Sequence, residues 1–250
     1  MREQIDTIPV NEAFDAGDEC PFCQLAKKAE ESAIRYVIGP GASYMEPDVR
    51  GVTDAKGFCR EHTKKLYDYG NMLGNALILQ TYYAGLLENF REEVKNFQTP
   101  PKKSLFGKKP TATDRWWQRL KEKEASCYLC EKNEYNMRRY FDTFFAMIRE
   151  PEFRKKVEGS KGFCMRHFAE LLRVAEDKLP NQLHEWFYRE IFRLMEENLV
   201  RVKEDLDWFV GMFDYRQAGA DWKNSRDAVA RTMQKLKGIY PADPPYKEIK

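Results

Sequence analysis

The chain has 250 residues, and its 42 Lys and Arg residues almost balance its 40 Asp and Glu residues, giving a formal net charge of +2. So small a net charge excludes a global electrostatic attraction to nucleic acid or to an anionic membrane surface. No apolar run reaches the roughly 18 residues that a membrane-spanning helix needs, and the first 18 residues lack the apolar region of a secretory signal. We therefore expect a cytoplasmic protein without a membrane segment.

Six cysteines and three histidines are present, and all of them except His184 fall into four short motifs. A CxxC motif at 20–23 is followed by GFCREH at 57–62, and a second CxxC at 127–130 is followed by GFCMRH at 162–167. Cytoplasmic thiols stay reduced, so cysteine pairs at this spacing favour metal ligation over structural disulfides.

Helical periodicity dominates the first part of the chain. Residues 1–18 are expected to form an irregular lead-in, and a helix is expected from Pro21 to the Gly-Pro-Gly sequence at 39–41. A long helical stretch follows over 59–97, in which Gly70 marks either a break or a close helix contact.

Residues 98–114 are rich in Pro, Lys, Gly and Thr, which predicts a flexible linker that is also a weak basic arm. Helices are then expected over 128–150, over 182–213 and, shorter, over 225–236. No stretch alternates apolar and polar residues as a half-buried strand would, so the predicted class is all-α.

An internal duplication is indicated by a match outside the cysteine motifs. Glu46-Pro47-Asp48-Val49-Arg50 resembles Glu150-Pro151-Glu152-Phe153-Arg154, and both lie between a CxxC and a GFCxxH. We expect a duplicated helical bundle with two pseudo-equivalent halves, each with one metal site and one long helix. The expected organisation is a single all-α domain over 1–250, with repeats at about 19–97 and 126–213, the basic linker 98–114, and a C-terminal helix and tail at 214–250.

Each copy is expected to form its own closed zinc site, since three thiolates and one imidazole make a complete tetrahedral ligand set. The expected cofactor is therefore structural zinc, two ions per chain. The predicted ligands are Cys20, Cys23, Cys59 and His62 in the first site, and Cys127, Cys130, Cys164 and His167 in the second.

Three alternatives stay open at this point. Cysteine-rich ligation also suits an iron–sulfur cluster, and Cys20-Pro21-Phe22-Cys23 resembles a redox-active dithiol. The basic residues from Lys102 to Lys109, together with the tryptophans, suit a nucleic-acid-associated protein. We predict packing or surface roles for His184 and for the Trp116–Trp117 pair.

The doubled motifs, the two EPxxR segments and the closing residues resemble an uncharacterised bacterial family, a domain of unknown function, from Cys20 to Gly238. The closing residues are Trp208-Phe209-Val210, Phe213 to Arg216, Ser225, Ala228 and Lys235 to Gly238. The resemblance implies a cytoplasmic protein with duplicated motifs and implies no activity.

No catalytic or cofactor-binding motif is recognised, so a non-enzymatic role is favoured and an enzyme stays an alternative. The favoured function is a zinc-stabilised scaffold, interaction or regulatory protein. We expect it to bind a protein partner or to self-associate through its long apolar helices.

Overall fold

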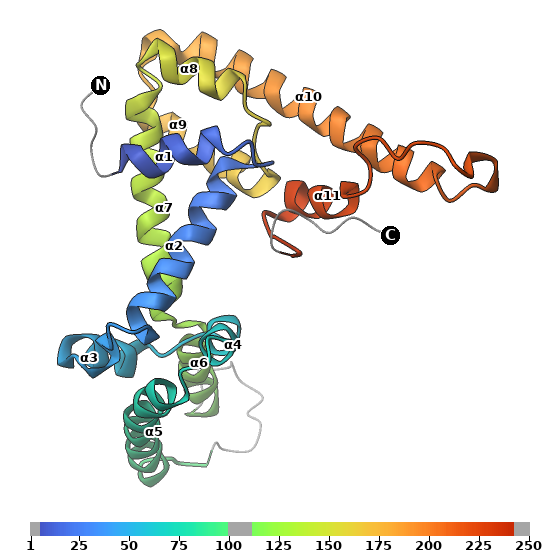
Figure 1. The fold of residues 1–250 in the computed structure, drawn as a ribbon. Coiled ribbons are helices and arrows are strands. Elements are labelled where there is room, and N and C mark those ends of the chain that lie inside the picture. Colours follow the sequence, from blue (N-terminus) through green and yellow to red (C-terminus); the bar gives the residue numbers. More distant parts are fainter. Residues whose placement is uncertain (1–5, 100–111, 243–250) are drawn as a thin grey trace, which may run out of the picture. The chain divides into compact units, whose positions relative to one another are not determined.

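The computed structural model describes residues 6–99 and 112–242, and every regular element in these ranges is helical (Figure 1). The all-α class is therefore confirmed for the described chain. The α-helices are α1 (Thr7–Asp15), α2 (Pro21–Ile38), α3 (Pro47–Lys56), α4 (Arg60–Asp68), α5 (Met72–Lys95), α6 (Ala112–Ala125), α7 (Tyr128–Met147), α8 (Pro151–Glu158), α9 (Met165–Lys178), α10 (His184–Gly211) and α11 (Ala228–Lys237). Short 3₁₀ turns lie at Ser43–Met45, Asn181–Leu183 and Tyr215–Gln217.

The chain forms two compact units, and one is inserted into the other along the sequence. Unit 1 comprises Met1–Lys28 and Asn136–Lys250, and unit 2 comprises Ala29–Tyr135. Helix α2 begins in unit 1 and ends in unit 2, whereas α7 begins in unit 2 and ends in unit 1. These boundaries differ from those of the expected repeats, and the single domain over 1–250 stays a prediction.

Unit 1 is built on an aromatic core. Phe22 stacks on Phe141 with ring centroids 4.3 Å apart, and Phe144 lies edge-on to Phe22 and to Phe163. Two of these rings, Phe22 and Phe163, are the apolar residues written inside a CxxC and a GFCxxH motif. The cysteine motifs are therefore anchored to the main core of this unit by their own neighbours.

Helix α1 corrects the expectation of an irregular lead-in over 1–18. Val10, Ala13 and Phe14 lie at positions i, i+3 and i+4, so one side of this short helix is apolar. All three are buried, and Phe14 contacts four phenylalanine rings of the core. The segment was too short and too acidic around this stripe for its periodicity to be recognised.

Unit 2 has a smaller apolar core, to which one predicted metal ligand contributes. Its buried cluster is Ala33, Ile34, Val37, Ile38, Leu66, Ile78, Cys127 and Leu129. The expected long helix over 59–97 is interrupted where Gly70 adopts a φ of 89°. The side chain of Asn71 then caps α5 by accepting a hydrogen bond from the Gly74 backbone at 3.0 Å.

The two EPxxR segments form the same local element. Both α3 and α8 begin with the proline of this motif, whose missing N–H and fixed φ suit the first helical position. Val49 and Phe153, two residues later, are both buried. Most of the expected linker, residues 100–111, lies outside the described residues, and with it the basic side chains from Lys102 to Lys109.

Candidate metal centres

The eight predicted ligands gather into two groups, and each group combines residues from both copies of the motif. Site A consists of Cys20, Cys23, Cys164 and His167, and site B of Cys59, His62, Cys127 and Cys130. Within each group the ligand atoms all lie within 4.8 Å of one another. Site A lies wholly in unit 1 and site B wholly in unit 2.

The expected pairing within each copy is therefore wrong. The first CxxC meets the second GFCxxH, and the second CxxC meets the first GFCxxH. The two sites are nested along the chain, because all four residues of site B lie between Cys23 and Cys164 of site A. The physical reason is that the entropic cost of closing a loop rises only slowly with its length, so the shorter loop within one copy has little advantage. The packing of the helices then decides which motif halves meet.

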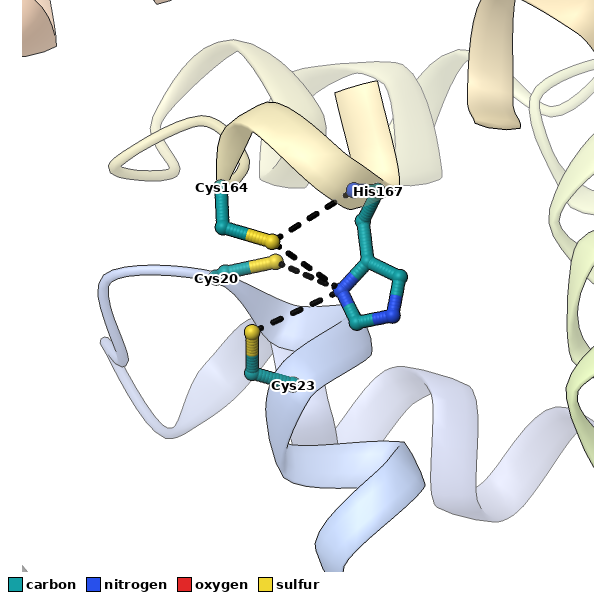
Figure 2. A group of neighbouring side chains, drawn as sticks. All are labelled: Cys20, Cys23, Cys164 and His167. Atoms are coloured by element: carbon teal, nitrogen blue, oxygen red, sulfur yellow. Dashed lines mark hydrogen bonds between the residues drawn. The ribbon is translucent and has the colours of Figure 1, made fainter. Parts of the chain in front are cut away.

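In site A three sulfurs converge on one nitrogen (Figure 2). The Sγ atoms of Cys20 and Cys23, at the start of α2, lie 3.4 Å from Nδ1 of His167. The Sγ of Cys164, which precedes α9, lies 3.3 Å from the same atom. All four residues are buried.

Site B has the same arrangement around His62. Its Nδ1 lies 3.3 Å from the sulfurs of Cys59, Cys127 and Cys130. The sulfurs of Cys59 and Cys130 are 3.8 Å apart. Unlike site A, it is partly open, because Cys130 is exposed and Cys59 is half-buried.

These contacts cannot all be hydrogen bonds, because an imidazole Nδ1 carries either one proton or one lone pair. They match the edges of a tetrahedron around a single ion. With Zn–S near 2.3 Å and Zn–N near 2.0–2.1 Å, the sulfur–nitrogen edge is about 3.6 Å and the sulfur–sulfur edge about 3.8 Å. The donor type and the spacing of both sites therefore fit a four-coordinate ion.

Helix N-termini surround both sites. Cys164 and Cys59 are the N-caps of α9 and α4, and Cys20 and Cys127 directly precede α2 and α7. Three thiolates and a neutral imidazole leave a net charge of −1 around a divalent ion, which the positive ends of the helix dipoles stabilise. Backbone N–H groups also reach the sulfurs, from His167 to Cys164 at 3.4 Å and from Cys130 to Cys127 at 3.5 Å.

Each GFCxxH motif enters its helix through a glycine with positive φ. Gly57 has a φ of 63° and Gly162 a φ of 72°, which residues with a Cβ rarely adopt. The carbonyl of Gly57 accepts a hydrogen bond from the N–H of Tyr128 at 3.0 Å. This bond joins the two motif halves of site B beside the ligands.

In site A the thiols would compete for one negative charge if no cation were present. Hydrogen bonds from Cys20 and Cys23 lower the pKa of Cys164 far below its usual range. Burial raises the pKa of Cys20, and its hydrogen bond with Cys164 adds to this effect. Three ionised sulfurs at this depth therefore need a cation among them.

In site B the histidine would be protonated in the metal-free chain. Burial alone would lower the pKa of His62, but hydrogen bonds with Cys127 and Glu30 overcome it and raise the pKa to about 10. Burial would raise the pKa of Cys127, but its hydrogen bond with His62 lowers it to about 6. A metal ion bound there would have to displace the histidine proton, so its affinity for site B would rise with pH.

A carboxylate orients the imidazole of site B. Since Nδ1 faces the sulfurs, Nε2 carries the proton and donates to Oε1 of Glu30 at 2.9 Å. Lys65 donates to both oxygens of Glu30, at 2.8 Å and 2.7 Å. Such carboxylate–histidine pairs fix the ring and its tautomer at metal sites. In site A the ring of His167 instead lies near Phe22 and Phe141, with ring centroids 5.9 Å and 6.4 Å away.

Helix α11 packs along α10 (Figure 1). It brings a buried cation close to site A. Lys235 is 1% exposed and donates to the carbonyl of Glu19 at 2.6 Å, one residue before Cys20. Its ammonium lies 3.3 Å from the Glu19 carboxylate, which also pairs with Arg201 at 2.5 Å. Burial lowers the pKa of Lys235, while the charges of Glu19 and Cys20 act in the opposite direction.

This contribution of α11 was not predicted from the sequence. The described helix buries its polar face, with Arg231, Gln234 and Lys235 inside and Met233 and Leu236 exposed. The usual pattern is therefore inverted in α11, and the sequence offers no signal for it, because periodicity alone does not tell which face of a helix is buried.

Gly238, at the C-cap of α11, lies directly over site A. Its φ is 69°, and a Cβ built there would lie 2.9 Å from the sulfur of Cys164 and 3.5 Å from that of Cys23. The Tyr240 hydroxyl then donates to Asp18 at 2.9 Å, and Asp18 accepts the backbone N–H of Cys20 at 2.8 Å. The end of α11 therefore covers site A so closely that a residue larger than glycine at position 238 would contact the ligand sulfurs.

Other candidate residues lie outside both groups. His184 is exposed and contacts only the ring of Tyr188 among the described aromatic residues. Trp116 packs against Phe90, and Trp117 is exposed. None of the described helices is both long enough and apolar enough to cross a membrane.

Comparison with known proteins assigns the family. The profile of a family of unknown function, DUF6062, matches residues 1–243. The chain belongs to this family. It is also 24% identical over 203 residues to an uncharacterised 23.9 kDa protein in the xynA 3′ region of Caldicellulosiruptor sp. (strain Rt8B.4), covering 80% of this chain and 84% of that relative. No solved structure matches the chain. The family resemblance seen in the sequence is confirmed, and it brings no known activity.

The crossed pairing predicts how paired substitutions affect metal content. Cys23→Ser with Cys164→Ser damages site A alone, so the double variant should retain one metal ion per chain. Cys23→Ser with Cys59→Ser damages both sites and should retain less than one. Elemental analysis after gel filtration measures the metal content of both variants. If the Cys23/Cys59 variant retained more metal than the Cys23/Cys164 variant, the ligands would instead be paired within each copy.

Gly238→Ala should weaken metal binding at site A by about 10–100-fold, because the added methyl group displaces a ligand sulfur. Gly219→Ala is the matched control, since Gly219 also has a positive φ, 86°, but has nothing within 4 Å of the added carbon. Both changes strain the backbone, and only the first reaches a sulfur. Equal affinities of the two variants in a chelator competition would contradict the contact.

Proposed function

We propose that this chain is a zinc-binding protein in which two structural Cys₃His sites, A and B, hold a helical scaffold together. The observation that carries the proposal is the convergence of three sulfurs on one imidazole nitrogen in each site, at 3.3–3.4 Å. Both ligand sets have four protein donors, which is typical of structural zinc, whereas a catalytic zinc keeps a position open.

The geometry favours a single ion over an iron–sulfur cluster. A cluster spreads its cysteines over several irons that are bridged by sulfide, so its protein ligands do not share one centre. Here all three sulfurs contact the same nitrogen atom. Zinc is favoured among single ions because it accepts mixed sulfur and nitrogen donors in a tetrahedron, and reduced thiols of this kind suit the cytoplasm.

The proposed role of zinc is to fasten parts of the chain that are far apart in sequence. Site A joins Cys20 and Cys23 to His167 across 147 and 144 positions, and site B joins residues 65–71 positions apart. A metal clip stabilises the folded state most when it closes long loops, and a structural zinc contributes on the order of 10 kcal/mol. Unit 2 depends more on its site, because its buried apolar cluster is much smaller than that of unit 1.

Zinc loss should therefore unfold the protein, and unit 2 should be affected first. Protein purified without oxygen should be colourless and should contain two zinc ions per chain. A zinc chelator should lower the melting temperature and should open 29–135 to limited proteolysis before the rest of the chain. Zinc should reverse both effects and magnesium should not, since magnesium prefers oxygen ligands. A brown protein that contains iron and inorganic sulfide would contradict the proposal.

We also propose that the scaffold self-associates through α5. Only Gly74 and Ile78 of its 24 residues are buried, so most of its apolar stripe is exposed. Leu73, Leu87 and Val94 fall at multiples of seven residues, with Tyr83 on the same side, as in a helix that packs along another helix. All four are exposed, Leu73 and Tyr83 each at 67%.

Sedimentation velocity tests this association directly. The zinc-loaded chain should form a dimer, and Leu87→Glu with Val94→Glu should return it to a monomer by placing charge on the stripe. Asn89→Glu adds one negative charge to the same helix outside the stripe and should leave the dimer intact. A wild-type chain that sediments as a monomer at all concentrations would exclude self-association.

A further inference from the structure

The two sites differ in how far solvent reaches their sulfurs. In site A, Cys20, Cys23 and Cys164 are each at most 2% exposed, and the fully buried rings of Phe22 and Phe163 belong to the same motifs. In site B, Cys130 is exposed, Cys59 is half-buried and only Cys127 is buried among the three cysteines. Small reagents in water can therefore reach the sulfurs of site B but not those of site A, although the two donor sets have the same composition.

The two accessible sulfurs of site B are also neighbours. The Sγ atoms of Cys59 and Cys130 are 3.8 Å apart, and a disulfide between them requires an approach to about 2.05 Å. The third sulfur, on Cys127, lies in the buried cluster of unit 2 with Leu129. Access and proximity therefore select the same pair of residues.

We propose that Cys130 and Cys59 are a peroxide-sensitive modification site, whose oxidation to a disulfide opens site B while site A stays closed. This inference rests on the proposed function, since it assigns a regulation to one of the two sites. The ligand class is hydrogen peroxide or a small organic hydroperoxide, which is small enough to reach an exposed sulfur.

The reaction balances with the peroxide as the oxidant. The Cys130 thiolate attacks one peroxide oxygen, so that an S–O bond forms, the O–O bond breaks and hydroxide leaves, giving a sulfenic acid. The Cys59 thiolate then attacks the Cys130 sulfur, so that the S–S bond forms, the S–O bond breaks and a second hydroxide leaves. The two sulfurs lose two electrons in total, and the peroxide gains them. Site B then has two donors left, Cys127 and His62.

The consequence of oxidation is confined to unit 2. Cys59 is the N-cap of α4 and Cys130 lies in the first turn of α7, so the disulfide keeps these two helix starts together. The ion, however, loses half of its ligands, and its binding energy no longer supports the small core of this unit. Reduction of the disulfide and supply of zinc reverse the change.

The test follows zinc release from the zinc-loaded full chain under excess hydrogen peroxide, with a colorimetric zinc indicator and peptide mapping without reduction. We expect one zinc ion per chain to leave at least about tenfold faster than the other, together with a peptide joined through Cys59 and Cys130. A thiol reductant with zinc should restore the original content. Release of both ions at one rate would overturn the proposal, as would a first disulfide within site A or between Cys127 and Cys130.

Two double variants provide matched controls. Cys23→Ser with Cys164→Ser keeps site B and should release its remaining zinc at the fast rate. Cys59→Ser with Cys130→Ser keeps site A and should release its zinc at the slow rate. If either variant fails to fold, the disulfide mapped in the wild-type chain still decides the question. The zinc content before peroxide is added tests the proposed function separately, and a chain without zinc can still be mapped for the Cys59–Cys130 disulfide.

Discussion

The contact on which both candidate sites depend is the approach of three cysteine sulfurs to the Nδ1 atom of a single histidine. Thiolates at this spacing repel one another, and burial makes each charge costlier, so the arrangement needs a cation at its centre. The surroundings serve that requirement. Helix N-termini point at the sulfurs, Glu30 orients His62, and Lys235 places a buried positive charge beside the segment that carries Cys20.

The nested order of the ligand pairs gives the two sites different tasks. Site B closes unit 2, which is an insertion in the sequence of unit 1. Site A joins the segments of unit 1 that precede and follow this insertion. Compared with pairing inside one copy, the site A loop is roughly 3.5-fold longer, which costs only about 1 kcal/mol more in closure entropy. That difference is small beside the binding energy of a structural zinc ion, so the chain can adopt either pairing without a prohibitive loss.

Much of the fold could be predicted from local patterns, because helices are local structures. The periodicity of the apolar residues predicted the long helix that became α10. At Gly70 the sequence left open a break or a close helix contact, and the structure has the break. The types and spacing of Cys and His likewise predicted which eight side chains would gather. The partner of each half-motif could not be predicted, because both CxxC motifs and both GFCxxH motifs present nearly the same donors. Glu30 and Gly238 were missed for a related reason, since only tertiary packing brings them to a histidine or a sulfur.

We propose one ion in each crossed set of ligands, and cadmium-113 NMR tests this proposal most directly. Cadmium accepts the same sulfur and nitrogen donors as zinc, and its coupling to cysteine β-protons identifies the ligands of each ion. We expect two cadmium resonances, one coupled to Cys20, Cys23 and Cys164 and the other to Cys59, Cys127 and Cys130. A resonance coupled to Cys20, Cys23 and Cys59 would contradict it.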